Sequence, residues 1–296
     1  MELRDIEIFL TLAEELHFGR TAARLHVSPG RISQVIKKQE RSVGAHLFER
    51  TSRAVRLTPL GEQLRDDLRP HYQGLLQSLV RARLAAQGKT EMLRVGMIST
   101  NAYELRPYWD EFRARHPACG LTIRHNAFID PFVPLRNGDI DVLVAWLPVE
   151  EPDLTAGPVV FSEPKVLLVS SDHELAERIS VPPEVRGDFA GATAVPSLPE
   201  YWEDSFHPFY TPTGRMVEKS LFVRSVEDIL VAVGSGEVIQ NLGAHASRHF
   251  ARPGIVFLPI EDSALLRWAL VWRSDRENRW IRGLADIARD LGTIEM

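Results

Sequence analysis

The turn at Ser28 and Pro29 constrains the fold of this chain more than any other feature, because it separates two helical patterns directly. The short segment before it carries Ala22 and Ala23, whose small side chains allow another helix to approach closely. Ser28 is a favourable N-cap, and Pro29 suits the first helical position because its fixed φ is helical and its missing amide hydrogen would be unpaired there. Together with an earlier amphipathic helix, this pattern is typical of a helix-turn-helix. The apolar stripe of that first helix comprises Ile6, Phe9, Leu10, Ala13 and Leu16.

The helix that starts after this turn has one apolar and one basic face. On a helical wheel Ile32, Val35, Ile36, Gln39 and Val43 fall on one side. Glutamine and arginine can pair with base edges, lysine can hold phosphates, and glycine lets the backbone approach DNA. We therefore predict a helix that reads the major groove. The face opposite the apolar one carries Gly30, Gln34, Lys37 and Arg41, flanked by Arg31, Ser33 and Lys38.

The charge of this region supports nucleic-acid binding, although the whole chain has a formal net charge of -5. Between residues 20 and 58 the basic side chains outnumber Glu40 and Glu49 by nine to two, and an ordinary solvated face is the alternative. Val55 and Leu57 alternate with arginines, which predicts a two-stranded wing whose tip suits phosphate or minor-groove contact. The residues expected to contact DNA are Arg20, Ser28, Gly30, Arg31, Ser33, Gln34, Lys37, Lys38, Arg41, Arg50, Thr51, Arg53 and Arg56.

Three stretches resemble the N-terminal signature of the LysR-type transcriptional regulators, namely residues 13–28, 47–51 and 57–62. The chain departs from that signature at Pro29, Gly30 and Arg31, where the family usually has Gln-Pro-Ala or Gln-Pro-Ser, so no base preference is transferred. The resemblance implies a bacterial, sequence-specific DNA-binding transcription regulator modulated by a small-molecule effector. It also implies three parts: a winged helix-turn-helix at 1–58, a linker helix and hinge at 59–91, and an effector domain at 92–296.

The linker pattern begins with Thr58 and Pro59, which repeat the N-cap and first-position pairing. Pro70 should kink or interrupt the helix, because proline removes one backbone hydrogen bond, and Gly88–Glu91 is a plausible hinge. In the family this helix pairs with its copy in a second subunit, which implies a homodimer, a tetramer through further contacts, and an interrupted inverted repeat in the DNA. The stripe available for that pairing comprises Leu60, Leu64, Leu68, Leu75, Leu76, Leu79 and Leu84 with Ala82 and Ala86.

The last two hundred residues alternate short β-branched runs with helical stretches, which favours parallel sheets covered by helices. The motifs at 135–141 and 266–272 resemble the family's effector domain, which is built like a small periplasmic binding protein. We therefore expect an α/β multidomain protein whose effector domain has two subdomains joined by two crossover strands. Subdomain I would take about 92–161 and 265–296, and subdomain II about 162–264.

A ligand in such a domain lies beyond the carboxyl ends of the strands, where helix N-termini present free amides. A hydroxyl-rich helix N-terminus at Ser99 and Thr100 would favour a small organic molecule, an anion or a polar compound with an apolar body. The alternative is ordinary capping and turn chemistry. Gln240 and Asn241 add polar groups near the expected cleft, and the aromatic, acidic segment 200–210 could shape the ligand site or a subunit contact. The expected effector-binding residues are Ser99, Thr100, Asn101, Phe128, Trp146, Ser197, Tyr201 and Ser225.

Other classes of protein lack support in the sequence. No catalytic motif, Walker loop or paired cysteines occur, so we expect neither an enzyme nor a cofactor, and His17 and His26 lack companions for a metal. The lone Cys119 is read as a packing residue. No apolar run approaches the ~18 residues of a membrane span, and no signal-peptide pattern is present, so a cytoplasmic protein is expected. A constitutive DNA-binding protein, whose C-terminal half only oligomerises, stays open as a rival.

Overall fold

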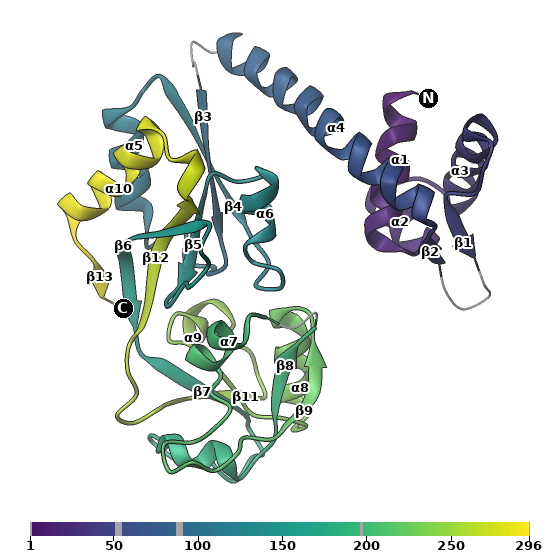
Figure 1. The fold of residues 1–296 in the computed structure, drawn as a ribbon. Helices are drawn as coiled ribbons and strands as arrows, with labels where there is room; N and C mark the ends of the chain where they lie inside the picture. The colour runs from purple at the N-terminus through teal and green to yellow at the C-terminus, as the bar shows by residue number, and fades with distance from the viewer. Residues whose placement is uncertain (1, 51–54, 87–90, 196–197, 296) are drawn as a thin grey trace. The chain divides into compact units, whose positions relative to one another are not determined.

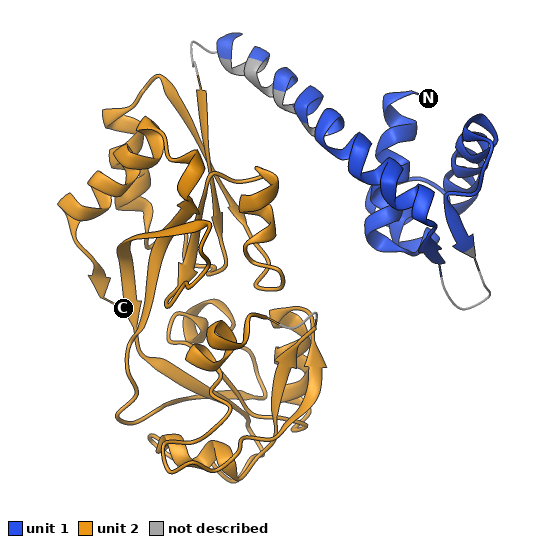
Figure 2. Cartoon of the chain, in the orientation of Figure 1, with its two compact units in different colours: residues 1–88 blue, residues 89–296 orange. Residues whose placement is uncertain are grey.

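The computed structural model describes residues 2–50, 55–86, 91–195 and 198–295. The chain forms two compact units, Met1–Gly88 and Lys89–Met296, which are described separately below (Figure 2). Unit 1 holds the helix-turn-helix, the wing and the long helix. Its elements are α1 (Leu3–Glu15), α2 (Phe18–Leu25), α3 (Pro29–Val43), β1 (Phe48–Arg50), β2 (Val55–Leu57) and α4 (Pro59–Ala86).

The N-terminal half of unit 1 has the predicted helix-turn-helix and wing (Figure 1). The Ser28 hydroxyl accepts the backbone amide of Arg31 at 3.2 Å, so Ser28 is the N-cap of α3. Strands β1 and β2 pair antiparallel. Side chains from α1, α3 and the wing bury one shared apolar core, which stabilises α3 against its neighbours. Its fully buried members include Ile8, Phe9, Leu12, Ile32, Ile36 and Leu47.

The apolar face of α3 differs from the predicted one at its last turn. Val43 is 41% exposed rather than buried, because α3 ends there and Gly44 turns the chain away in a left-handed conformation. Glu40 is buried instead, and its carboxylate accepts the backbone amides of Leu47 and Phe48 at 3.1 and 3.3 Å. A carboxylate therefore joins α3 to the first wing strand.

Helix α4 runs without a break from Pro59 to Ala86, so the prediction that Pro70 could interrupt it is wrong. Its first half packs on the core of unit 1, where Leu64, Leu68 and Tyr72 lie against buried residues. Gly61 is required for this packing, because a Cβ there would overlap the Leu47 carbonyl oxygen. The predicted hinge lies largely outside the described residues. The described leucines of α4 that remain exposed are Leu60, Leu75, Leu76 and Leu79.

Unit 2 consists of two lobes. Lobe I carries a six-stranded sheet in the order β13-β6-β12-β5-β3-β4, covered by α5 and α10 (Figure 1). Strands β3, β4 and β5 are parallel, as the sequence predicted, whereas β12 runs antiparallel to β5 and β6. The elements of lobe I are β3 (Glu91–Met97), α5 (Arg106–Arg115), β4 (Cys119–His125), α6 (Val133–Asn137), β5 (Val142–Trp146), β6 (Leu154–Glu163), β12 (Leu266–Arg273), η2 (Ser274–Arg276), α10 (Arg279–Leu291) and β13 (Ile294–Glu295).

Lobe II lies between β6 and β12 in the chain and has two small sheets. Strand β7 pairs antiparallel with β10 and β11, so the expectation of parallel sheets is wrong for this sheet. Only β8 and β9 are parallel among the described strands of this lobe. Its elements are β7 (Lys165–Ser170), η1 (Pro183–Gly187), β8 (Gly191–Ala194), α7 (Glu200–Phe206), β9 (Lys219–Val223), α8 (Val226–Gly234), β10 (Gln240–Gly243), α9 (Ala246–His249) and β11 (Ile255–Pro259).

Helix α7 of lobe II packs into the core of lobe I. The indole of Trp202 is fully buried and stacks on Trp146 of β5, with ring centroids 3.5 Å apart and planes within 8°. Each indole N–H donates to the other residue's carbonyl oxygen, at 2.9 and 3.2 Å. The Tyr201 hydroxyl also donates to Glu151 at 2.9 Å. The aromatic segment 200–210 therefore joins the lobes.

A buried carboxylate forms a second joint where β6 leaves lobe I. Glu163 is fully buried and accepts the backbone amide of His245, at 2.8 Å. Its oxygens also lie 2.8 and 2.9 Å from Nδ1 of His245, and one accepts the indole N–H of Trp268 at 2.8 Å. Gly243 packs so closely against this carboxylate that a Cβ on it would be 2.6 Å from Cδ of Glu163. The joint therefore needs a glycine at this place.

We predict that Gly243→Ala lowers the free energy of unfolding of unit 2 by about 1–3 kcal/mol, because the added methyl group overpacks a site without free space. The matched control is Gly234→Ala at the end of α8, where an added methyl group would have its nearest neighbour, an atom of Ile255, at 3.8 Å. All six tryptophans lie in unit 2, so urea unfolding followed by tryptophan fluorescence reports this unit alone. Equal midpoints for the two variants would contradict the proposed crowding at Glu163.

Candidate DNA-binding face and ligand cavity

The outward face of α3 presents polar and basic side chains to solvent. Gly30, Arg31, Gln34, Lys37 and Arg41 are exposed, and Ser33 is half-buried. In the described part of the chain, the side chains of Arg31, Gln34 and Lys37 form no hydrogen bond or ion pair, whereas Arg41 donates to the Lys37 carbonyl at 3.3 Å. Donors held on a rigid helix without internal partners are free for a nucleic acid.

Other residues predicted to contact DNA have internal roles or lie outside the described residues. Arg20 is held by an ion pair with Glu15, and Lys38 lies 3.6 Å from a buried oxygen of Asp5. The Ser28 hydroxyl serves as the cap of α3, and Arg56 is exposed on β2. The predicted wing tip, with Thr51, Arg53 and the side chain of Arg50, falls outside the described part of the structure.

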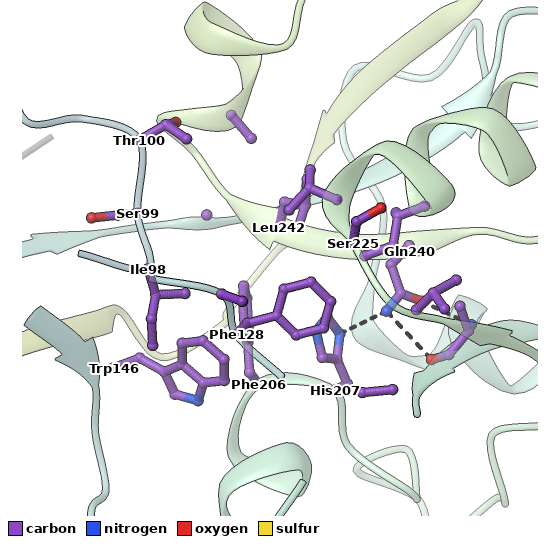
Figure 3. A pocket seen from close by; sticks show the side chains of 18 of the residues that line it. Ile98, Ser99, Thr100, Phe128, Trp146, Phe206, His207, Ser225, Gln240 and Leu242 are labelled. Carbon is purple, nitrogen blue, oxygen red and sulfur yellow. Dashed lines mark hydrogen bonds between the residues drawn. The ribbon is translucent and has the colours of Figure 1, made fainter. Parts of the chain in front are cut away.

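A cavity of about 270 Å³ lies between the two lobes of unit 2 (Figure 3). Most of its wall is apolar, with aromatic rings from both lobes, and a few polar groups interrupt it. Such a composition is typical of a small-molecule site. Side chains that form the wall include Ile98, Phe128, Trp146, Phe206, Leu242 and Trp268.

Five of the predicted effector residues line this cavity: Ser99, Thr100, Phe128, Trp146 and Ser225. Figure 3 shows the Thr100 side chain pointing toward the cavity, whereas the Ser99 hydroxyl points away from the labelled rings. The Ser99 oxygen is buried and has no hydrogen-bond partner in the described residues. Ser225 caps α8 by accepting the amide of Asp228 at 3.1 Å.

Two predicted effector residues do not line the cavity, and a third, Ser197, lies outside the described residues. Asn101 is fully buried in the turn after β3, where its carbonyl accepts the amide of Glu104. Tyr201 faces the opposite side of α7 and binds Glu150 and Glu151. The predicted helix N-terminus at Ser99 is also wrong, because a turn intervenes and α5 begins only at Arg106.

The sequence did not single out the polar groups that α7 and the following turn bring to the cavity. His207 accepts a hydrogen bond at Nδ1 from the Gln240 amide, 3.1 Å away, which leaves the ring proton on Nε2. Burial, together with the charges of Arg186, Lys219 and Lys165, holds the pKa of His207 well below its usual range. His207 is therefore a neutral donor. The only sequence signal for it was the aromatic, acidic composition of segment 200–210.

Glu203 is the buried carboxylate of the cavity wall, and it lies one turn before His207. Its Oε1 accepts both the Lys219 ammonium and the Thr193 hydroxyl at 2.7 Å. The Lys219 ammonium also lies 3.8 Å from the centre of the Phe209 ring. Of this ion pair, only Glu203 lines the cavity.

The described residues form neither a metal site nor a reactive thiol. No group of three or more His, Cys, Asp or Glu side chains there could hold a metal ion. Cys119 is buried, and burial raises the pKa of its thiol to about 11, so the reactive thiolate is disfavoured. No helix in the described part of the chain is long and apolar enough to cross a membrane.

Each of the two units matches the model of a known protein family. The model of the bacterial regulatory helix-turn-helix protein, lysR family, matches residues 3–62, and that of the LysR substrate binding domain matches residues 86–292. The chain is 25% identical over 292 residues to the HTH-type transcriptional regulator AlsR of Bacillus subtilis, covering 97% of this chain and 95% of that protein. It is 36% identical over 166 residues to the HTH-type transcriptional activator IlvY of Salmonella typhimurium, covering 55% and 54%.

Among solved structures, full-length CbnR complexed with its target DNA matches with a TM-score of 0.63 at 20% identity, over 99% of this chain and 100% of that one, which shows a shared fold. A helix-turn-helix followed by a two-lobed ligand-binding unit defines a transcription regulator rather than an enzyme. The chain belongs to the LysR family of bacterial regulatory proteins.

We predict that Arg31→Ala or Gln34→Ala weakens binding to the operator by about 1–3 kcal/mol and spares non-specific DNA, as the loss of a base contact does. Footprinting on DNA flanking the protein's own gene would locate the operator, and titration would give the affinities. Arg113→Ala in α5 is the control, because this exposed arginine is paired with Asp110 in unit 2. Unchanged footprints for both α3 variants would contradict the orientation of α3.

Proposed function

We propose that this regulator binds an operator through the exposed face of α3 and that a small organic molecule in the interlobe cavity changes that binding. The cavity is the observation that carries the proposal, because both lobes supply its wall. A ligand that touches both lobes can prefer one arrangement of them, and only such a preference shifts a conformational equilibrium. Ligand binding would thereby change the binding of unit 1 to DNA.

The DNA contacts that we propose are those of the α3 face together with the wing. Arg31 and Gln34 are placed to read bases, while Lys37, Arg41 and Arg56 are placed to hold phosphates. The relative named CbnR was solved with its target DNA, which agrees with this role. Because chromosomal DNA is the target, we propose that the protein acts in the cytoplasm.

We further propose that two chains pair through α4 and that dimers associate into a tetramer. Leu75, Leu76 and Leu79 support the pairing, because they are exposed large apolar side chains on one stretch of a long helix. Exposed leucines at this spacing suit contact with a second helix. Two symmetric recognition helices would read an interrupted inverted repeat. The three-part division at residues 58 and 91 belongs to the same proposal.

We predict that a metabolite library screened by thermal shift contains compounds that stabilise the full-length protein, by about 2.7 kcal/mol at a hundred times the dissociation constant. Ala127→Trp should abolish this shift, because Ala127 lines the cavity and is exposed enough to accept a larger side chain. Ala127→Ser is the control and should keep it. The stabilising compounds should also alter the operator footprint. A library without any stabilising compound, with regulation in cells unaffected by Ala127→Trp, would favour a constitutive regulator.

A further inference from the structure

The polarity of the cavity wall restricts the chemistry of its ligand. Apart from Glu203, the charged side chains that line the cavity are Arg224 and Glu227, which are exposed and opposite in sign. Three histidines also line the cavity: His125 is exposed, His207 is neutral, and Nδ1 of His245 is already bonded to Glu163. The described wall therefore offers no buried lysine or arginine to a ligand carboxylate, and burial of a charge without a partner is strongly unfavourable.

The helix ends at the cavity do not supply the missing positive charge. The N-terminus of α8 already carries the carboxylates of Glu227 and Asp228 in its first turn, and Asp228 accepts the amides of Arg224 and Ser225. The amide before α9 is likewise occupied by the buried carboxylate of Glu163. The chain's own carboxylates thus hold the positions where an anionic ligand would gain most.

Glu203 can accept a hydrogen bond from a ligand, whereas a ligand carboxylate would need a cation or a donor. This side chain is only 4% exposed, it lines the cavity, and both of its hydrogen bonds in the described residues go to Oε1. Its Oε2 has no hydrogen-bond partner there. Oε2 is not one of the polar atoms that the described fold encloses completely, so a donor can reach it. A hydrogen bond to a charged group is stronger than one between neutral groups. A ligand that brings a donor to Oε2 therefore gains a hydrogen bond to a charged group, whereas a ligand carboxylate would be buried without a partner.

We propose that the ligand is an uncharged compound with an apolar body and a hydrogen-bond donor, such as a carboxamide N–H, and that Glu203 Oε2 accepts this donor. The proposal rests on the function proposed above and names the class of molecule for the same cavity. Of the two ligand classes expected from the sequence, the anion is disfavoured because the helix start expected at Ser99 lies elsewhere. Glu203 is the specificity-determining residue. Lys219 already neutralises it at 2.7 Å, so the ligand needs no positive charge.

Benzamide and benzoate are matched probes, because they share a ring and differ in the donor and the charge. Isothermal titration of the full-length protein should give a dissociation constant for benzamide about tenfold or more below that for benzoate, as the gain or loss of one charge-assisted hydrogen bond implies. Equal binding, tighter binding of benzoate, or no binding of benzamide at millimolar concentrations would overturn the proposal.

Two variants test the role of Glu203 itself. In Glu203→Gln the new carbonyl oxygen stays with Lys219, so the amide N–H group faces the cavity and the preference should reverse toward benzoate. Glu200→Gln makes the same change at an exposed residue of α7 that does not line the cavity, and it should leave the preference for benzamide unchanged. An unchanged preference in a folded Glu203→Gln protein would overturn the assignment. If that variant does not fold, the ratio of the two dissociation constants in the wild-type protein still decides between the two ligand classes.

The metabolite library separates failure of this proposal from failure of the proposed function. Stabilising compounds that are mainly carboxylates would overturn the ligand class and leave the cavity as an effector site. A library with no stabilising compound at all would remove the effector site, and with it the proposal that rests on it.

Discussion

The stacked indoles of Trp146 and Trp202 are the contact on which the ligand-binding unit depends. Separation of the lobes at this point would expose two large rings and remove the carbonyl acceptors of two indole N–H groups. Phe206 packs edge-on against Trp146 at 5.1 Å and lines the cavity with it. A ligand that touches these rings therefore acts on the side chains that hold the lobes together.

Buried carboxylates complete this arrangement. Glu163 lies at the junction of β6 with lobe II and is bonded to groups from α9 and β12, while Glu203 is bonded to Lys219 and Thr193 within lobe II. Burial of each charge is tolerated because donors surround it. Among the described residues Glu163 has partners for both oxygens, whereas Glu203 keeps one oxygen without a partner. This difference makes one carboxylate structural and the other available to a ligand.

The sequence predicted the elements whose signals are local. Ser28 with Pro29 marks a helix start through capping, which depends on neighbouring residues alone, and this start is confirmed. The apolar periodicity of α1 and α3 also predicted the buried face, except at Val43, where the helix end decides exposure. Family resemblance, rather than local pattern, supplied the two-lobed architecture.

The missed parts of the candidate site depend on contacts distant in the sequence. Nothing local to Trp202 indicates that α7 enters the core of lobe I, and this packing turns Tyr201 away from the cavity and brings Glu203 and His207 to it. The turn between Ser99 and α5 was likewise invisible, because Asn101 and its neighbours also fit a helix start. The ligand role of Thr100, Phe128, Trp146 and Ser225 stays a prediction.

The central claim, that a symmetric dimer of this regulator reads DNA by sequence, is tested most directly by selection of duplexes from a random pool with the full-length protein. The account predicts enrichment of an inverted repeat whose half-sites are separated by one helical turn, about 10–10.5 base pairs, or a multiple of it. Recovery of duplexes with no common sequence, or of a single half-site bound by one chain, would contradict it.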